Sequence, residues 1–146
     1  MFVLDTNIVS ELMRAAPEPA VQAWVAVRRA GDMYFSAVSE AELRYGVAIL
    51  PTGRRRDALA EAVDGLVRED FAGRVLSFDS TAAQAYAEIA ATRRRAGRPV
   101  CQADCQIAAV AQARGFAVAT RNVRDFAGMG IEVVNPWAGA TPVTMG

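Results

Sequence analysis

The sequence contains no histidine and no lysine, so all sixteen of its basic residues are arginines. These absences exclude Ser-His-Asp and Cys-His catalytic groups, paired-histidine metal sites and phosphate-binding loops that need a lysine. Only two cysteines occur, Cys101 and Cys105, which excludes a disulfide framework. Their spacing in a predicted helix is poorly suited to a disulfide, and we expect both to be reduced thiols of the core. Carboxylates, hydroxyls, the two cysteines and arginines remain for acid–base or metal chemistry.

An excess charge of one sign and long apolar runs are also missing. Sixteen arginines balance sixteen Asp and Glu residues, so no long-range positive field favours duplex DNA, and any contact with nucleic acid must be local. No apolar run approaches the roughly 18 residues of a membrane span. The first residues lack the basic and apolar regions of a signal peptide. We therefore expect a soluble, cytoplasmic protein that does not contact a membrane.

Short apolar runs alternate with longer amphipathic segments over the 146 residues, which predicts one α/β domain. The predicted strands are nearly all apolar, as is typical of a parallel sheet with both faces covered. They span residues 2–4, 33–36, 75–78, 116–119 and 132–134. The predicted helices span residues 8–13, 19–30, 41–50, 54–71, 81–96 and 103–114. We expect a short parallel sheet sandwiched by helices within residues 1–136, followed by an irregular tail of residues 137–146.

Several helix ends carry recognisable signals. Ser39 and Glu42 have the spacing of a capping box, in which each side chain bonds the other residue's backbone amide. Ser80 follows a predicted strand and is the expected N-cap of the next helix. Gly97 and Gly115 stand where glycines commonly end helices.

Four carboxylates are predicted to gather at one edge of the sheet. Asp5 ends the first strand, and Asp125 lies on a loop or short turn after the fourth. Glu42 and Asp104 are expected in the first turns of two helices whose N-termini point toward that edge. An open parallel sheet binds its ligands beyond the carboxyl ends of its strands. Asp79 also follows a strand, but with Ser80 and Thr81 it resembles ordinary capping chemistry and is left out of the site.

Two interpretations of these four acids remain open. Each alone could be structural: Asp5 as a helix cap, Glu42 as the capping-box partner, Asp104 as a favourable first-turn charge and Asp125 as a turn residue. Together, four carboxylates within several ångströms repel one another unless a cation neutralises them or some are protonated. Mg²⁺ suits such a site, because it prefers oxygen ligands and keeps waters that can be activated to attack a phosphodiester.

Four segments together resemble the signature segments of PIN-domain ribonucleases, and most closely those of the VapC/FitB-type toxins of bacterial toxin–antitoxin pairs. They occur in the family's order and at its usual spacing, from Met1 to about Pro136. The segments are MFVLDTN (residues 1–7), SEAELRYG (39–46), ADCQIAA (103–109) and TRNVRDF (120–126).

The resemblance implies a role for each matching position. Asp5, Glu42, Asp104 and Asp125 match the acidic quartet that holds Mg²⁺, or Mn²⁺ as a substitute, with Asp5 and Asp104 as direct ligands. In such enzymes the metal binds a scissile phosphate of single-stranded or loop RNA and its water attacks in line. Polar neighbours match positions that orient the quartet or a metal-bound water, namely Thr6, Asn7, Thr120 and Asn122.

Arginine clusters and three aromatic residues are weaker candidates for RNA contacts. Two clusters could hold RNA phosphates or could be ordinary solvated helix faces, and the second is favoured because it precedes the Asp104 segment. Three aromatic residues could stack on bases, although packing in the core or an interface is the commoner role at such positions. The clusters are Arg54, Arg55 and Arg56, and Arg93, Arg94 and Arg95 with Arg98; the aromatics are Trp24, Tyr45 and Trp137.

Expected partners follow partly from the apolar helices of residues 19–71, which exceed what one small sheet needs for its cover. The resemblance implies a homodimer and a small antitoxin whose C-terminal segment obstructs the acidic pocket, often with an inserted arginine. The antitoxin would then be the DNA-binding partner, in agreement with the neutral charge of this chain.

Three other interpretations compete with this one. A haloacid-dehalogenase-like phosphatase also begins with a strand ending in Asp, but it needs a second Asp two residues later and generally a lysine, whereas this chain has Asn7 and no lysine. An α/β interaction module would use its acids only as caps and would bind no divalent metal. A PIN nuclease in RNA processing or DNA cleavage would keep the fold without an antitoxin.

Overall fold

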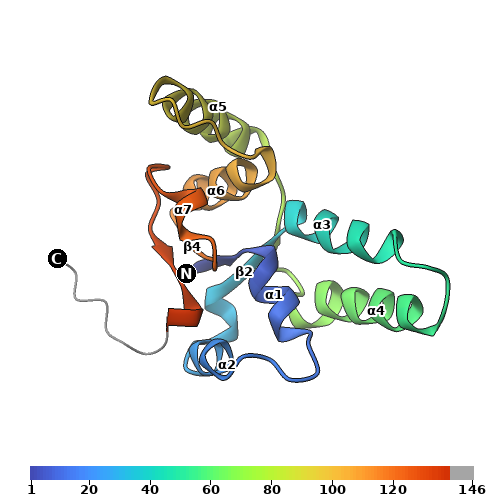
Figure 1. Ribbon diagram of the computed structural model, residues 1–146. Helices are drawn as coiled ribbons and strands as arrows, with labels where there is room; N and C mark the ends of the chain where they lie inside the picture. Colours follow the sequence, from blue (N-terminus) through green and yellow to red (C-terminus); the bar gives the residue numbers. More distant parts are fainter. Residues whose placement is uncertain (139–146) are drawn as a thin grey trace.

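Figure 1 shows the computed structural model, which describes residues 1–138. Five parallel strands form one sheet in the order β3-β2-β1-β4-β5. The predicted strands at residues 2–4 and 33–36 are confirmed to the residue, and the other three are shorter than predicted. The strands are β1 (Phe2–Leu4), β2 (Met33–Ser36), β3 (Val75–Leu76), β4 (Ala117–Ala119) and β5 (Val133–Val134).

Helices account for most of the remaining chain. All six predicted helices are present, with shifted ends, and α7 was not predicted as a helix. The helices are α1 (Thr6–Leu12), α2 (Pro19–Ala26), α3 (Ala37–Ala48), α4 (Arg54–Gly65), α5 (Ser80–Arg95), α6 (Gln102–Arg114) and α7 (Val123–Phe126), with short 3-10 helices η1 (Ala30–Asp32) and η3 (Pro136–Ala138) and a π-helical turn η2 (Leu66–Asp70).

Helices cover both faces of the sheet, as predicted. Side chains that alternate along a strand point to opposite faces, and Val3 and Leu4 of β1 accordingly belong to two different hydrophobic clusters. The first cluster packs α5, α6 and α7 against one face of the sheet. The second packs α1, α2 and the η2 segment against the other, and Figure 1 shows α6 and α2 on opposite sides of the strands.

The central strand β1 lies between β2 and β4, where the chain changes direction across the sheet. In open parallel sheets this switch point is where ligands bind. Leu4 pairs with Ala119, so the next residues, Asp5 and Thr120, leave the sheet side by side. Because α6 ends just before β4 begins, its first turn, which carries Asp104, lies toward the same carboxyl edge.

Two of the predicted helix ends were wrong, and the reason is an earlier cap. Ser36, not Ser39, is the N-cap of α3: its Oγ accepts a hydrogen bond from the Ser39 amide at 3.1 Å. The helix therefore starts at Ala37, Glu42 lies beyond its first turn, and the predicted capping box is absent from it. Likewise Asp79, not Ser80, caps α5 by accepting from the Ala82 amide at 2.9 Å.

Other differences also have local causes. Strand β3 stops at Leu76 instead of residue 78 because β2, its neighbour, ends at Ser36 where α3 is capped. The predicted helix of residues 54–71 changes into the π-helical turn, in which the Phe71 amide bonds the Leu66 carbonyl five residues back. Gly97 and Gly115 follow α5 and α6 with positive φ, as their positions predicted.

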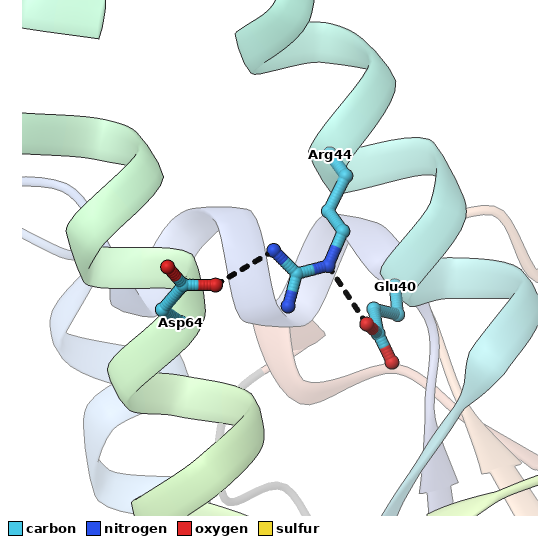
Figure 2. A network of polar contacts seen from close by, with 3 residues as sticks. All are labelled: Glu40, Arg44 and Asp64. Atoms are coloured by element: carbon cyan, nitrogen blue, oxygen red, sulfur yellow. Dashed lines mark hydrogen bonds and ion pairs between the residues drawn. The ribbon is translucent and has the colours of Figure 1, made fainter. Parts of the chain in front are cut away.

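Helices α3 and α4 form an arm that extends away from the sheet in Figure 1. Arg44 joins them, since its guanidinium donates to Glu40 at 2.7 Å and to Asp64 of α4 at 2.8 Å (Figure 2). Its hydrogen bond lowers the pKa of Asp64. This charged network lies apart from the carboxyl edge of the sheet, so its acidic residues can serve as controls for substitutions of the acids at that edge.

The predicted tail of residues 137–146 lies mostly outside the described residues. Its first two residues, Trp137 and Ala138, belong to η3 and are ordered against the domain. Among residues 1–138, no helix is both long enough and apolar enough to cross a membrane.

Candidate functional site

A pocket of about 600 Å³ opens at the carboxyl edge of the sheet. Three of the four predicted acids line it: Asp5 after β1, Glu42 on α3 and Asp104 on α6. Residues separated by about a hundred positions in the chain thus share one cavity, because β1 ends and helices α3 and α6 begin at this edge of the sheet. Of the predicted supporting residues, Thr6, Asn7 and Asn122 also line the pocket.

Asp5 is buried, and both of its carboxylate oxygens accept hydrogen bonds. Its side chain is 5% exposed, and one oxygen, Oδ1, accepts a hydrogen bond from the Thr6 amide at 2.7 Å. The other, Oδ2, accepts from Thr120 Oγ at 2.7 Å and from the Asn7 side-chain amide at 3.2 Å. Asp5 is therefore the N-cap of α1, as the structural interpretation held, and at the same time part of the pocket wall.

The polar neighbours connect the acids to one another. Thr6 Oγ1 donates to Glu42 Oε1 at 2.7 Å, which ties α1 to α3. Asn7 donates to the buried Thr120 hydroxyl at 3.3 Å and accepts from the Arg121 amide at 3.3 Å, which ties α1 to the loop after β4. The carboxylates of Asp5 and Glu42 are thus oriented by neighbours that the sequence singled out.

The acids are close enough for their charges to interact. Burial raises the pKa of Asp5 above its ordinary value, against the lowering effect of the hydrogen bonds from Thr120 and Thr6. Burial, followed by the charges of Asp5, Asp125 and Glu42, raises the pKa of Asp104 from 3.8 to about 6. Perturbed carboxyl groups in a cleft are typical of functional sites.

Asp125 occupies a different position from the other three. It lies on α7, is exposed, and does not line the pocket, although its charge acts on Asp5 and Asp104. The loop before it is held by the Thr120 hydroxyl, which accepts from the Asn122 amide at 3.0 Å. The predicted quartet is therefore a trio around the pocket with a fourth acid at its edge.

The spacing of the acids limits how a metal could be held. Over the described residues, no group of three or more His, Cys, Asp or Glu side chains is positioned to hold a metal ion. Mg²⁺ is usually held by one or two carboxylates and retains several waters. The arrangement therefore fits a hydrated ion on one or two of these acids better than a closed protein cage.

In the favoured arginine cluster, Arg93 differs from the other three members. Arg93 is buried: it donates to the backbone carbonyls of Arg98, at 2.9 Å, and Ala127, so its guanidinium fastens the end of α5 to the segment after α7. The expectation that Arg93 faces RNA is wrong for this reason. Arg94, Arg95 and Arg98 are exposed, and of the other cluster Arg54 and Arg55 are exposed as well.

The two cysteines also differ from one another. Cys105 is buried and free, with its thiol 3.9 Å from the Tyr86 carbonyl oxygen. Cys101 is exposed at the start of α6, so the expectation that both are core thiols is wrong for Cys101.

Several pocket residues were missed in the sequence. Glu11 is buried and pairs with the exposed Arg14 at 2.9 Å, and Arg121 also lines the pocket. A sequence signal exists for one wall: a polar stripe at helical spacing follows Asp5, namely Asn7, Ser10, Glu11 and Arg14. Trp137, one of the three aromatics named from the sequence as able to stack on bases, also lines the pocket, where the tertiary fold places it.

Asp104→Asn is expected to stabilise the chelator-treated protein above about pH 6. The folded state keeps the Asp104 proton up to about pH 6, whereas the unfolded chain loses it near 3.8, so this group makes stability fall as pH rises through that window. The substitution removes this loss. Melting temperatures measured from about pH 4 to 8 should show a variant advantage that disappears toward pH 4.

Asp64→Asn is the matched control for this measurement, because it removes a carboxylate that Arg44 stabilises in its charged form. It should give no advantage at any pH. An Asp104→Asn protein that is less stable than wild type at neutral pH would contradict the electrostatic description of the pocket.

The chain is similar to known proteins over nearly its whole length. The PIN-domain family model matches residues 2–131. A VapC ribonuclease from Sinorhizobium fredii is 44% identical over 94% of this chain and 98% of its own length. The toxin FitB from Neisseria gonorrhoeae is 39% identical over 94% and 99%. The crystal structure of FitAcB from Neisseria gonorrhoeae superposes with a TM-score of 0.88 at 39% identity, covering 94% of this chain and 99% of that chain.

Proposed function

The chain belongs to the PIN-domain family, and we propose on this basis that it is the toxin of a toxin–antitoxin pair, an endoribonuclease that depends on a divalent metal ion. Relatives with the names VapC ribonuclease and toxin FitB align over nearly the whole chain. The observation that carries the proposal is the pocket in which Asp5, Glu42 and Asp104 meet, with the pKa values of Asp5 and Asp104 raised.

The donor set fits a hard cation such as Mg²⁺, with Mn²⁺ as a substitute. Carboxylate oxygens are the preferred ligands of both ions, and the pocket holds no imidazole or thiolate that would favour a softer metal. Asp5 and Asp104 would hold the ion directly, with Glu42 and Asp125 adding charge around it. When bound, such an ion acts as a Lewis acid toward a phosphodiester and lowers the pKa of water.

The residues of the chain have distinct tasks in this proposal. Thr120 and Asn7 fix the Asp5 carboxylate through hydrogen bonds, and Thr6 fixes that of Glu42. Their hydroxyl and amide donors hold the carboxylates in one orientation, so substrate binding requires little rearrangement. RNA is the substrate, and the exposed Arg94, Arg95 and Arg98 are candidates for contacts to its phosphates.

The partner of the toxin is a cognate antitoxin, and the chain is expected to act in the cytoplasm as a homodimer. Like charges crowd the acidic pocket, so an antitoxin that places a positive group there would both bind and obstruct it. The chain itself has a net charge of zero, which agrees with DNA binding by the antitoxin and not by the toxin.

Expression in a bacterial cell tests this role. Induction of the wild-type chain should stop growth and produce new RNA ends, and co-expression of its cognate antitoxin should restore growth. Asp104→Asn should not stop growth because it removes a carboxylate from the pocket, whereas Asp64→Asn, on the α3–α4 arm, should remain toxic.

Two outcomes would overturn the toxin role. Equal toxicity of wild type and Asp104→Asn would mean that the pocket is not responsible. If expression of the chain does not affect growth but the purified protein cleaves RNA in a metal-dependent way, the chain is a PIN nuclease outside toxin–antitoxin systems.

A further inference from the structure

The carboxylate pocket has one aromatic wall, made by Trp137 of η3. We propose that the Trp137 indole stacks on an unpaired nucleobase next to the phosphodiester that is cut, and so contributes to the selection of single-stranded RNA. This inference rests on the proposed ribonuclease function and adds a substrate-positioning residue to it.

Trp137 is held in place by its surroundings. Its backbone amide donates to Asn135 Oδ1 at 2.9 Å, and its ring packs against the second hydrophobic cluster. The side chain is half-buried, so part of the indole contacts the core while another part faces the pocket. A fixed, partly exposed ring loses little conformational freedom when a base stacks on it.

Arg121 connects this ring to the acids. Its guanidinium carbon lies 5.3 Å from the centre of the Trp137 ring, within the range of a cation–π contact. Its backbone amide donates to Asn7, which in turn donates to Asp5. A series of non-covalent contacts through Arg121 and Asn7 therefore links the aromatic wall to the buried Asp5 carboxylate.

The chemistry of the pocket favours a base at this wall. Carboxylates repel the phosphates of RNA, so binding energy must come in part from groups that carry no negative charge. A nucleobase is neutral and presents a π-face, and every base can stack on an aromatic ring. A pocket of about 600 Å³ lies within the usual range for small-ligand sites and leaves room for a base beside a phosphate.

Trp24 provides a matched control inside the same molecule. Both indoles are half-buried, pack against the second hydrophobic cluster and have an arginine over the ring, which is Arg28 at 3.7 Å for Trp24. Only Trp137 of the two lines the carboxylate pocket. A purely structural role predicts similar effects of substituting either residue, whereas stacking predicts a difference.

The first test compares Trp137→Leu with Trp24→Leu in steady-state cleavage of a short single-stranded RNA. Trp137→Leu should raise KM about 5- to 150-fold, corresponding to the roughly 1–3 kcal/mol of one base–aromatic stack, and Trp24→Leu should leave KM near the wild-type value. Equal effects of the two variants on KM would overturn the proposal.

The second test keeps Trp137 and does not depend on cleavage or on the stability of a Trp137 variant. In Trp24→Phe/Asp104→Asn protein, Trp137 is the only tryptophan, and the same RNA should quench its fluorescence, while a ribose-phosphate oligomer without bases should not. If the wild type cleaves RNA but this quenching is absent, the stacking proposal is overturned and the ribonuclease function is not. Quenching without cleavage by the wild type would support the stack and overturn the ribonuclease function.

Discussion

The Asp5→Asn protein should fold normally, and its rate of RNA cleavage should fall more than about 100-fold. Even the loss of a group that hydrogen-bonds to a metal ligand lowers metal affinity or activity about 10- to 100-fold. Asn is as good an N-cap as Asp, so α1 should keep its start. Removal of the buried charge also relieves the desolvation that raises the Asp5 pKa. Cleavage rates and melting temperatures of the same preparations separate the two effects.

Asp79→Asn is the control that makes this result specific. Asp79 and Asp5 both follow a strand and both cap the next helix through a carboxylate oxygen. Asp79 lies outside the pocket, so its substitution should preserve cleavage. If Asp5→Asn unfolds, or if both variants cleave RNA like the wild type, Asp5 has only the structural role of a cap.

Mn²⁺ or Mg²⁺ should bind the wild-type protein and stabilise it. An ion present at about 100 times its Kd adds about 2.7 kcal/mol to the free energy of unfolding when it binds only the folded state. The gain arises because the cation neutralises the acids whose mutual repulsion raises the Asp104 pKa. Calorimetric titration gives the affinity, and thermal unfolding with and without chelator gives the stabilisation.

Asp104→Asn should lose most of this binding, and Asp64→Asn should retain it. Asp64 already has a cationic partner in Arg44 and lies on the α3–α4 arm (Figure 2). Equal stabilisation of both variants by the ion would place the metal elsewhere on the protein. Absence of any uptake by the wild type would favour a protein whose acids are only caps.

Local patterns predicted the features that depend on neighbouring residues. The alternation of apolar strands and amphipathic helices was sufficient to predict the parallel sheet. The position of Asp5 at the end of β1 was sufficient to place it at the carboxyl edge of that sheet. Asp104 could be placed because its helix ends directly before a strand. The four segments together indicated the family that the whole-chain comparison shows.

Features that depend on tertiary contacts were not predictable in this way. The capping box at Ser39 was a valid local pattern, but Ser36 capped the helix first, at the end of β2. Arg93 belongs to a run of charges in the sequence, yet its guanidinium is buried and donates hydrogen bonds to the backbone carbonyls of Arg98 and Ala127. Trp137 reaches the pocket only because the tertiary fold packs the end of the domain against α2.

The most direct test is incubation of the purified protein with total bacterial RNA in Mg²⁺ or Mn²⁺, beside chelator-treated and Asp5→Asn samples. Discrete fragments that form only with wild-type protein and metal would establish that this pocket cuts RNA. Fragments of the same size and amount in the chelator or in the Asp5→Asn sample would contradict a metal-dependent nuclease built on these carboxylates.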